Sequence, residues 1–178
     1  MTVTNVSQKK PDLILEQYFL GKTFASGIFE DRFGNVRRQF TVDIDGTWDG
    51  KTLTLTEDFI FGDGETETRV WSIEKIAPAS YVGTADDVIG SAKGIVSGNT
   101  LNWKYDMRLK VGGSKVKVHF DDWMFLQPNG VLINKATVSK LGLDIGRVTI
   151  AFTKKADADF LSTIPSTNKE PLVATLVR

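Results

Sequence analysis

The stretch from Leu53 to Ile73 constrains the fold most, because it contains two segments of alternating polarity joined by a glycine turn. Asp-Gly between alternating apolar residues is a strong hairpin signal, and here it lies within Gly62-Asp63-Gly64. If Gly64 adopts the left-handed conformation of a three-residue loop, Glu57 faces Arg69 across the hairpin. One face then carries four apolar side chains: Leu53, Leu55, Trp71 and Ile73. The pattern predicts a sheet that lines an apolar space containing an acid opposite a base.

A second hairpin has its turn at Gly112-Gly113, because a two-residue turn with both residues at positive φ suits two glycines. Its outer face is charged and includes His119, which we therefore expect to be a surface residue. A slip of one residue would turn the aromatic side chains outward, so the register is strongly specified. The inner face carries these facing pairs: Leu109 with Val116, Met107 with Val118, Tyr105 with Phe120, and Trp103 with Asp122.

Alternation with a period of two continues from Lys22 to Phe152. Arg38 begins an inner face that continues through Phe40, and the turn at Pro128-Asn129-Gly130 places Asn134 on another inner face. Closing such a meander removes its edges. The sequence therefore predicts an all-β, antiparallel up-and-down barrel of roughly eight to ten strands, which can hold side chains or one small ligand.

The segment that precedes the strands predicts a short helix, with Asp12 as its N-cap and Gly21 as its stop. A helix of this length is not stable alone, so we expect it to pack on an end of the barrel. The predicted organisation is a disordered segment at 1–11, a barrel at 12–155 and a tail at 156–178 with a helical turn near 157–161.

The amino-acid composition argues against several classes of function. Lys and Arg together number 22 and Asp and Glu 22, so no basic excess favours nucleic-acid binding. With no cysteine and one histidine, a disulfide framework, a thiol nucleophile and a multi-His metal site are excluded. The first residues lack a secretory signal, and no segment approaches the ~20 apolar residues of a membrane span. We expect a cytoplasmic protein with no cofactor, no metal ion and no nucleic-acid partner.

Several motifs together resemble a mainly proteobacterial family of lipocalin-like domains, in the calycin group, whose function is unknown. They are DRFG at 31–34, DGTWDG at 45–50, EDFIFGDGE at 57–65, YVGTADDVIGSAKG at 81–94, FDDWM at 120–124 and NKATVSKLG at 134–142. The resemblance covers about 13–155 and implies a lipocalin-like barrel, but no activity. Many relatives look like outer-membrane lipoproteins with a leader and a lipidated cysteine, and this sequence has neither.

The predicted inner face holds five polar residues: Arg38, Glu57, Arg69, Asp122 and Asn134. Two arginines balance two carboxylates, as a low-dielectric interior requires. Because the arginine fork suits carboxylate or phosphate, Arg69 or Arg38 can take the head group of an amphipathic ligand. The alternative is a structural network in which Glu57 and Arg69 satisfy each other.

Five further inner side chains can either wall a pocket or fill the core: Phe59, Trp71, Trp103, Tyr105 and Met107. The first hypothesis is therefore the binding of a small hydrophobic or amphipathic ligand, fatty-acid or lipid-like. The second is an isomerase or lyase in which Glu57 or Asp122 acts as acid or base, after burial has raised its pKa. The third is a filled barrel that serves as a structural or interaction domain. Adjacent acids on a strand point to opposite faces, but Asp87 and Asp122 can meet across the barrel.

Overall fold

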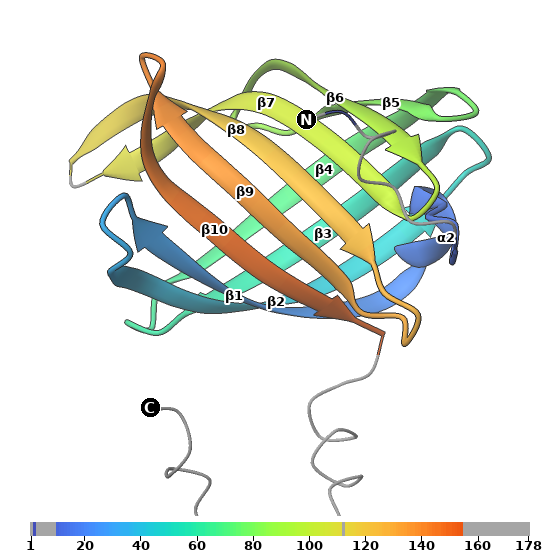
Figure 1. Cartoon of the computed structure of the whole chain (residues 1–178), viewed down its shortest axis with the longest axis horizontal. Coiled ribbons are helices and arrows are strands. Elements are labelled where there is room, and N and C mark those ends of the chain that lie inside the picture. The colour runs from blue at the N-terminus through green and yellow to red at the C-terminus, as the bar shows by residue number, and fades with distance from the viewer. Residues whose placement is uncertain (1, 3–9, 112, 155–178) are drawn as a thin grey trace, which may run out of the picture.

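The computed structural model describes residues 2, 10–111 and 113–154. Within them, ten antiparallel strands form a closed barrel in which each strand pairs with its neighbours in sequence and β1 closes onto β10 (Figure 1). The predicted all-β, antiparallel up-and-down barrel is confirmed. The strands are β1 (Gly21–Asp31), β2 (Val36–Trp48), β3 (Thr52–Phe61), β4 (Thr66–Ala77), β5 (Ser80–Thr84), β6 (Val88–Ser97), β7 (Thr100–Val111), β8 (Ser114–Leu126), β9 (Leu132–Lys140) and β10 (Leu143–Thr153).

Both predicted hairpin registers are confirmed. In β3–β4, Glu57 lies opposite Arg69, and Gly64 has a φ of +86°. In β7–β8, Trp103 lies opposite Asp122 and Tyr105 opposite Phe120. Strand β6 has a register shift between Ile89 and Lys93, next to its glycines. The periodicity therefore fixes which side chains enter the barrel.

The predicted N-terminal helix is present as α2 (Leu15–Tyr18), a single turn that lies across one end of the barrel (Figure 1). The prediction that Asp12 is its N-cap is wrong, because Ile14 holds that position and Asp12 pairs with Lys10 at 2.6 Å. The turn is stabilised by its contacts with the barrel, as its length requires. The Tyr18 hydroxyl donates a hydrogen bond to the Gly130 carbonyl at 2.9 Å.

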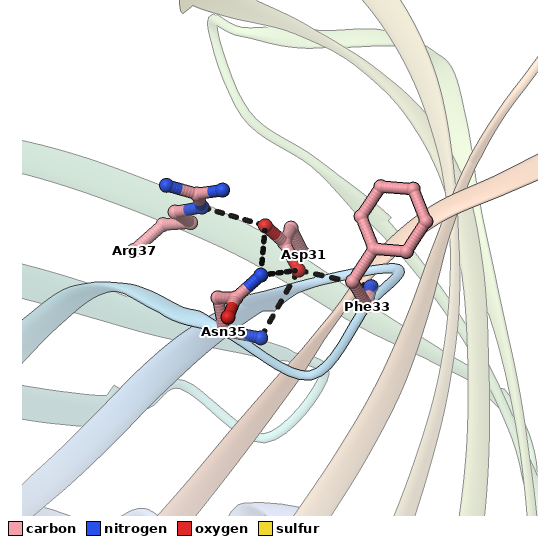
Figure 2. A network of polar contacts seen from close by, with 4 residues as sticks. All are labelled: Asp31, Phe33, Asn35 and Arg37. Atoms are coloured by element: carbon pink, nitrogen blue, oxygen red, sulfur yellow. Dashed lines mark hydrogen bonds and ion pairs between the residues drawn. The ribbon is translucent and has the colours of Figure 1, made fainter.

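The opposite end of the barrel is formed by the turns β1–β2, β3–β4, β5–β6, β7–β8 and β9–β10, and we call it the mouth. The DRFG motif forms the first of these turns around Asp31 (Figure 2). Asp31 Oδ1 accepts hydrogen bonds from the backbone N–H groups of Phe33 at 2.9 Å and Asn35 at 3.0 Å, and Oδ2 accepts one from Arg37 Nε at 2.6 Å. Burial opposes ionisation, yet the bonds from Asn35 and Arg37 hold the pKa of Asp31 well below its usual range.

Glycines in the wall make room for large aromatic rings inside the barrel. A Cβ atom added at Gly83 or Gly94 would lie 2.6 Å and 2.4 Å, respectively, from the indole ring of Trp103. The same relation holds between Gly27 and Phe40, at 2.4 Å. These rings therefore lie directly against the wall.

Two sets of expectations lie wholly or largely outside the described residues: disorder at 1–11, of which 2, 10 and 11 are described, and the tail at 156–178 with its helical turn near 157–161. Within the described residues, no helix is long and apolar enough to cross a membrane.

Candidate functional site

Three charged side chains meet inside the barrel near the mouth, and we call them the Arg69 cluster: Glu57, Arg69 and Asp87. Arg69 Nε donates a hydrogen bond to Asp87 Oδ2 at 2.8 Å. The register partner Glu57 is farther away, with 3.8 Å between its Oε2 and Arg69 Nη1. Glu67, on the same strand as Arg69, lies 3.5 Å from Nη2. Arg69 is therefore surrounded by three carboxylates.

Burial dominates the electrostatics of Glu57. It raises the pKa of this carboxyl to about 7, against the lowering effect of Arg69, and the charge of Asp87 raises it further. The pKa of Arg69 is itself raised, because Glu57 and Asp87 outweigh its burial. The Arg69 cluster thus has more acid than base.

The predicted balance of two arginines and two carboxylates is wrong, because Arg38 lies at the mouth rather than in the interior. Its Nη2 pairs with Asp63 Oδ2 at 3.3 Å and with Glu65 Oε2 at 2.5 Å, and both acids belong to the β3–β4 turn. Its guanidinium also lies over the ring of Phe61, 3.5 Å from the centroid. Arg38 is paired in register with Phe29 of β1 but lies beyond the last pair between β2 and β3, so the acids of the β3–β4 turn satisfy its charge.

Deeper in the barrel, Asp122 of β8 and Asn134 of β9 form a second polar site. They are 5% and 2% exposed, and Asn134 Nδ2 donates a hydrogen bond to Asp122 Oδ2 at 3.3 Å. Burial raises the pKa of Asp122 to about 7, while Asn134 and the side chain of Tyr105 lower it. Burial, followed by the charge of Asp122, raises the pKa of Tyr105 well above its usual value.

Three buried oxygens at these sites have no hydrogen-bond partner among the described residues: Asp87 Oδ1, Asp122 Oδ1 and Asn134 Oδ1. When the two carboxyls are ionised, all three oxygens can only accept hydrogen bonds. Buried acceptors of this kind are costly and uncommon in a folded protein. The interior is therefore arranged to receive donated hydrogen bonds.

Aromatic rings connect the two polar sites. Trp71 packs edge-on against both Tyr105 and Trp103, with ring centroids 5.3 Å and 5.7 Å apart. Tyr105 stacks on Phe120 at 5.0 Å. Nearer the mouth, Phe59 lies under the Arg69 guanidinium at 5.1 Å. All of the predicted site residues except Arg38 thus face the interior, and Met107 is fully buried.

The pairing of Asp87 with Arg69 is not predicted from the sequence, which suggests instead that Asp87 meets Asp122 across the barrel. The sequence does indicate an inward-facing acid here, because one of the two adjacent acids Asp86 and Asp87 can point into the barrel. The turn that aims it is held by a hydrogen bond from Arg108 N–H to the Asp87 carbonyl at 2.9 Å. His119 is exposed as expected and pairs with Asp106. Among the described residues, no group of three or more His, Cys, Asp and Glu side chains could hold a metal ion.

Comparisons with known proteins agree on the fold. The family model described as "Protein of unknown function (DUF3833)" matches residues 1–154. The S-type phycobiliprotein lyase CPES from Guillardia theta superposes with a TM-score of 0.58 at 6% identity, over 79% of this chain and 90% of that one. Rv2717c from M. tuberculosis superposes with a TM-score of 0.54 at 13% identity, over 82% of this chain and all of that one (100%). No curated protein matches the sequence. At these identities the two structures establish the barrel fold only.

Proposed function

Because the chain belongs to the DUF3833 family of proteins of unknown function, its activity must be inferred from its own barrel, and we propose that the barrel binds a small amphipathic, lipid-like molecule. The lipocalin-like affiliation suggested by the sequence motifs is part of this proposal. The observation that carries it is the pair Asp122 and Asn134, which are deeply buried and each have an oxygen with no hydrogen-bond partner in the described part of the chain.

A barrel that served only as a scaffold would gain nothing from this pair. Burying a carboxylate and an amide without full hydrogen bonding costs stability, and an apolar pair of similar size would pack more favourably. Perturbed ionisable groups inside an enclosed space are typical of binding and catalytic sites. The interior of this barrel holds two such carboxyls, Glu57 and Asp122, each with a pKa of about 7.

The polar end of the ligand is expected between Asp122 and the Arg69 cluster, with its apolar part against Trp71, Trp103 and Phe59. A fatty acid needs a free cation for its carboxylate, but Arg69 already faces three acids. A head group that donates hydrogen bonds, such as a hydroxyl or an ammonium, satisfies the unpartnered oxygens and offsets the acid excess. We therefore favour a lipid-like alcohol or amine over a fatty acid.

Entry is expected through the mouth, since α2 lies across the other end. Arg38 and Phe61 stack on each other at the mouth and must swing aside to admit a ligand. Both side chains are partly exposed, so their movement disrupts little of the core.

Binding can be tested with three amphiphiles that share one alkyl chain: dodecylamine, dodecanol and dodecanoic acid. Each is titrated below its micelle concentration at pH 8, with tryptophan fluorescence as the readout because Trp71 and Trp103 face the interior. We expect the amine to bind tightest, the alcohol next and the acid weakest. Asp122→Asn should reduce the preference for the amine, whereas the exposed Asp86→Asn should not.

Each alternative result has a distinct meaning. Tightest binding of dodecanoic acid would place the head group at Arg69 and support a fatty-acid carrier. Failure of all three to bind would favour a filled barrel that serves as a structural or interaction domain.

One observation favours a second candidate function, an enzyme of the isomerase or lyase type. A carboxyl with a pKa of about 7 can both donate and accept a proton near neutral pH, and Glu57 and Asp122 both have such values. One of the barrels that this chain resembles is a phycobiliprotein lyase. If a turnover assay on any bound molecule is insensitive to Glu57→Gln and to Asp122→Asn, this candidate is removed.

A further inference from the structure

The outer face of the β7–β8 hairpin, at the mouth, carries four cations in an unfavourable arrangement. Arg108 lies directly opposite Lys117, and Lys110 lies directly opposite Lys115. Like charges in directly opposed positions destabilise a pair of strands. Stability of the hairpin therefore gives no reason for this arrangement, and it points to a partner of negative charge.

Little on the protein compensates these cations. The acids on this face are Asp106, which is shared between Lys117 at 3.0 Å and His119 at 2.8 Å, and Asp121, which pairs with Lys104 at 3.5 Å. Across the part of the chain that the structure describes, no carboxylate pairs with Lys110, Lys115 or the nearby Lys140. Their charges are free to attract an anionic surface.

The β9–β10 turn adds an apolar side chain to the same region. A groove on the outer surface is lined by Lys115, Lys117, Lys140 and Leu141 together. Leu141 is 95% exposed. It also has a φ of +50°, and the following Gly142 has +78°. A turn with two positive φ values favours Asn-Gly, and a leucine there is strained.

Leu141 is strained and lies outside the hydrophobic core, beside lysines that no carboxylate among the described residues pairs with, and both features fit one partner. We propose that this surface, which we call the basic tip (Arg108, Lys110, Lys115, Lys117, Lys140 and Leu141), docks onto a membrane that contains anionic phospholipid. The lysines contact the phosphate head groups, and Leu141 enters the boundary with the acyl chains. In Figure 1 the β7–β8 and β9–β10 turns lie at the end of the barrel away from α2, so docking would turn the mouth towards the lipid.

Flotation with vesicles tests the proposal independently of any ligand in the barrel. One set contains phosphatidylcholine only, and the other contains about a third phosphatidylglycerol, close to the charge of an anionic leaflet. The wild-type protein should float with the mixed vesicles and not with phosphatidylcholine alone. Raising the salt from about 0.1 M to about 0.5 M should release it, because the attraction is screened.

Two variants separate the apolar and the charged contributions. Leu141→Asn removes the apolar group and supplies the residue that the turn prefers, so folding is preserved; vesicle binding should weaken roughly tenfold. Lys115→Gln and Lys140→Gln should each weaken it about fivefold. The control is Ile95→Thr, which removes a side chain that is 55% exposed near the α2 end and should leave binding unchanged.

Two flotation results would overturn the proposal. In the first, the wild-type protein does not float with the mixed vesicles. In the second, Leu141→Asn leaves flotation unchanged. Equally strong binding to a short DNA duplex, indifferent to Leu141→Asn, would assign the basic tip to nucleic acid. A dimer that Leu141→Asn dissociates, with no vesicle binding, would assign it to a second copy of the chain.

Discussion

Asp87 accepts a hydrogen bond from Arg69 Nε at 2.8 Å, although 18 positions separate the two residues in the chain. The β5–β6 turn carries Asp87 over the interior face of β4, where Arg69 already lies near Glu57. The contact adds a third carboxylate around Arg69, beside those of Glu57 and Glu67. It therefore makes the interior an acceptor-rich environment rather than an anion site.

Removal of Arg69 is expected to be strongly destabilising. Arg69→Met leaves Glu57, Asp87 and Glu67 without their cation, and breaking a buried ion pair from one side costs about 3–5 kcal/mol. Because Glu57 can take up a proton, the loss should be larger at pH 8 than at pH 5. Urea denaturation measures this loss of stability, and Arg147→Met, at an exposed arginine, is the control.

A double-mutant cycle isolates the contact between Arg69 and Asp87. Asp87→Asn in the Arg69→Met background should recover part of the lost stability, since it removes one uncompensated charge. Additive effects of the two substitutions would show that the 2.8 Å contact contributes no coupling energy.

The free energy of unfolding should fall as the pH rises towards 7. Glu57 and Asp122 have folded pKa values of about 7 against ordinary values of 4.5 and 3.8, so the folded state binds more protons than the unfolded state between those limits. In that window stability decreases with pH, by roughly 3–4 kcal/mol for each group once both states are ionised. Thermal melts from pH 4 to pH 8 in steps of about one unit measure the slope.

Asp122→Asn should flatten this profile and raise stability at pH 8, because the amide carries no charge to bury. Asp86→Asn, on the exposed neighbour of Asp87, should leave the profile unchanged. A wild-type profile that rises between pH 5 and pH 7 would contradict the raised pKa values.

The contact of Trp103 with two wall glycines should make both positions intolerant of a methyl group. Gly94→Ala and Gly83→Ala bring a Cβ to 2.4 Å and 2.6 Å, respectively, from the indole, so each should cost about 1–3 kcal/mol through overpacking. Gly62→Ala is the matched control, because its Cβ would have 3.6 Å to the nearest atom. Urea denaturation and near-UV circular dichroism of the tryptophans report the effect.

The β9–β10 turn should gain stability when its strained leucine is replaced. Leu141→Asn relieves a φ of +50° that a leucine tolerates poorly, and we expect a gain of about 0.5–1 kcal/mol. Comparing the urea denaturation midpoints of the wild-type protein and the Leu141→Asn variant measures this gain directly. A loss of stability would mean that Leu141 has a packing role despite its exposure.

Much of the fold can be predicted because two local signals agree. Period-two alternation assigns each side chain to a face, and a turn glycine such as Gly64 fixes the register, which is why Glu57 is correctly placed opposite Arg69. The helix is harder to delimit, since its length depends on contacts with the barrel end, such as that of Tyr18 with Gly130, rather than on a cap at Asp12.

The candidate site is less predictable than the fold. Alternation places Arg38 on an inner face, but it cannot show that this residue lies at the mouth, within reach of Asp63 and Glu65. Nor can alternation show that Asp87 meets Arg69, because that contact depends on the conformation of the β5–β6 turn. Charges that face each other across a hairpin are predictable, whereas charges that a turn brings from another part of the chain are not.

Native mass spectrometry of the freshly purified protein tests most directly whether the barrel holds a ligand, with Asp122→Asn measured beside the wild type. We predict that the wild-type protein carries a bound small molecule that is released on denaturation, and that the variant carries less of it. Solvent extraction should then identify a lipid-like molecule with a hydroxyl or amino head group. An unliganded mass for the wild type, unchanged after dodecylamine, dodecanol or dodecanoic acid is added, would contradict a binding function.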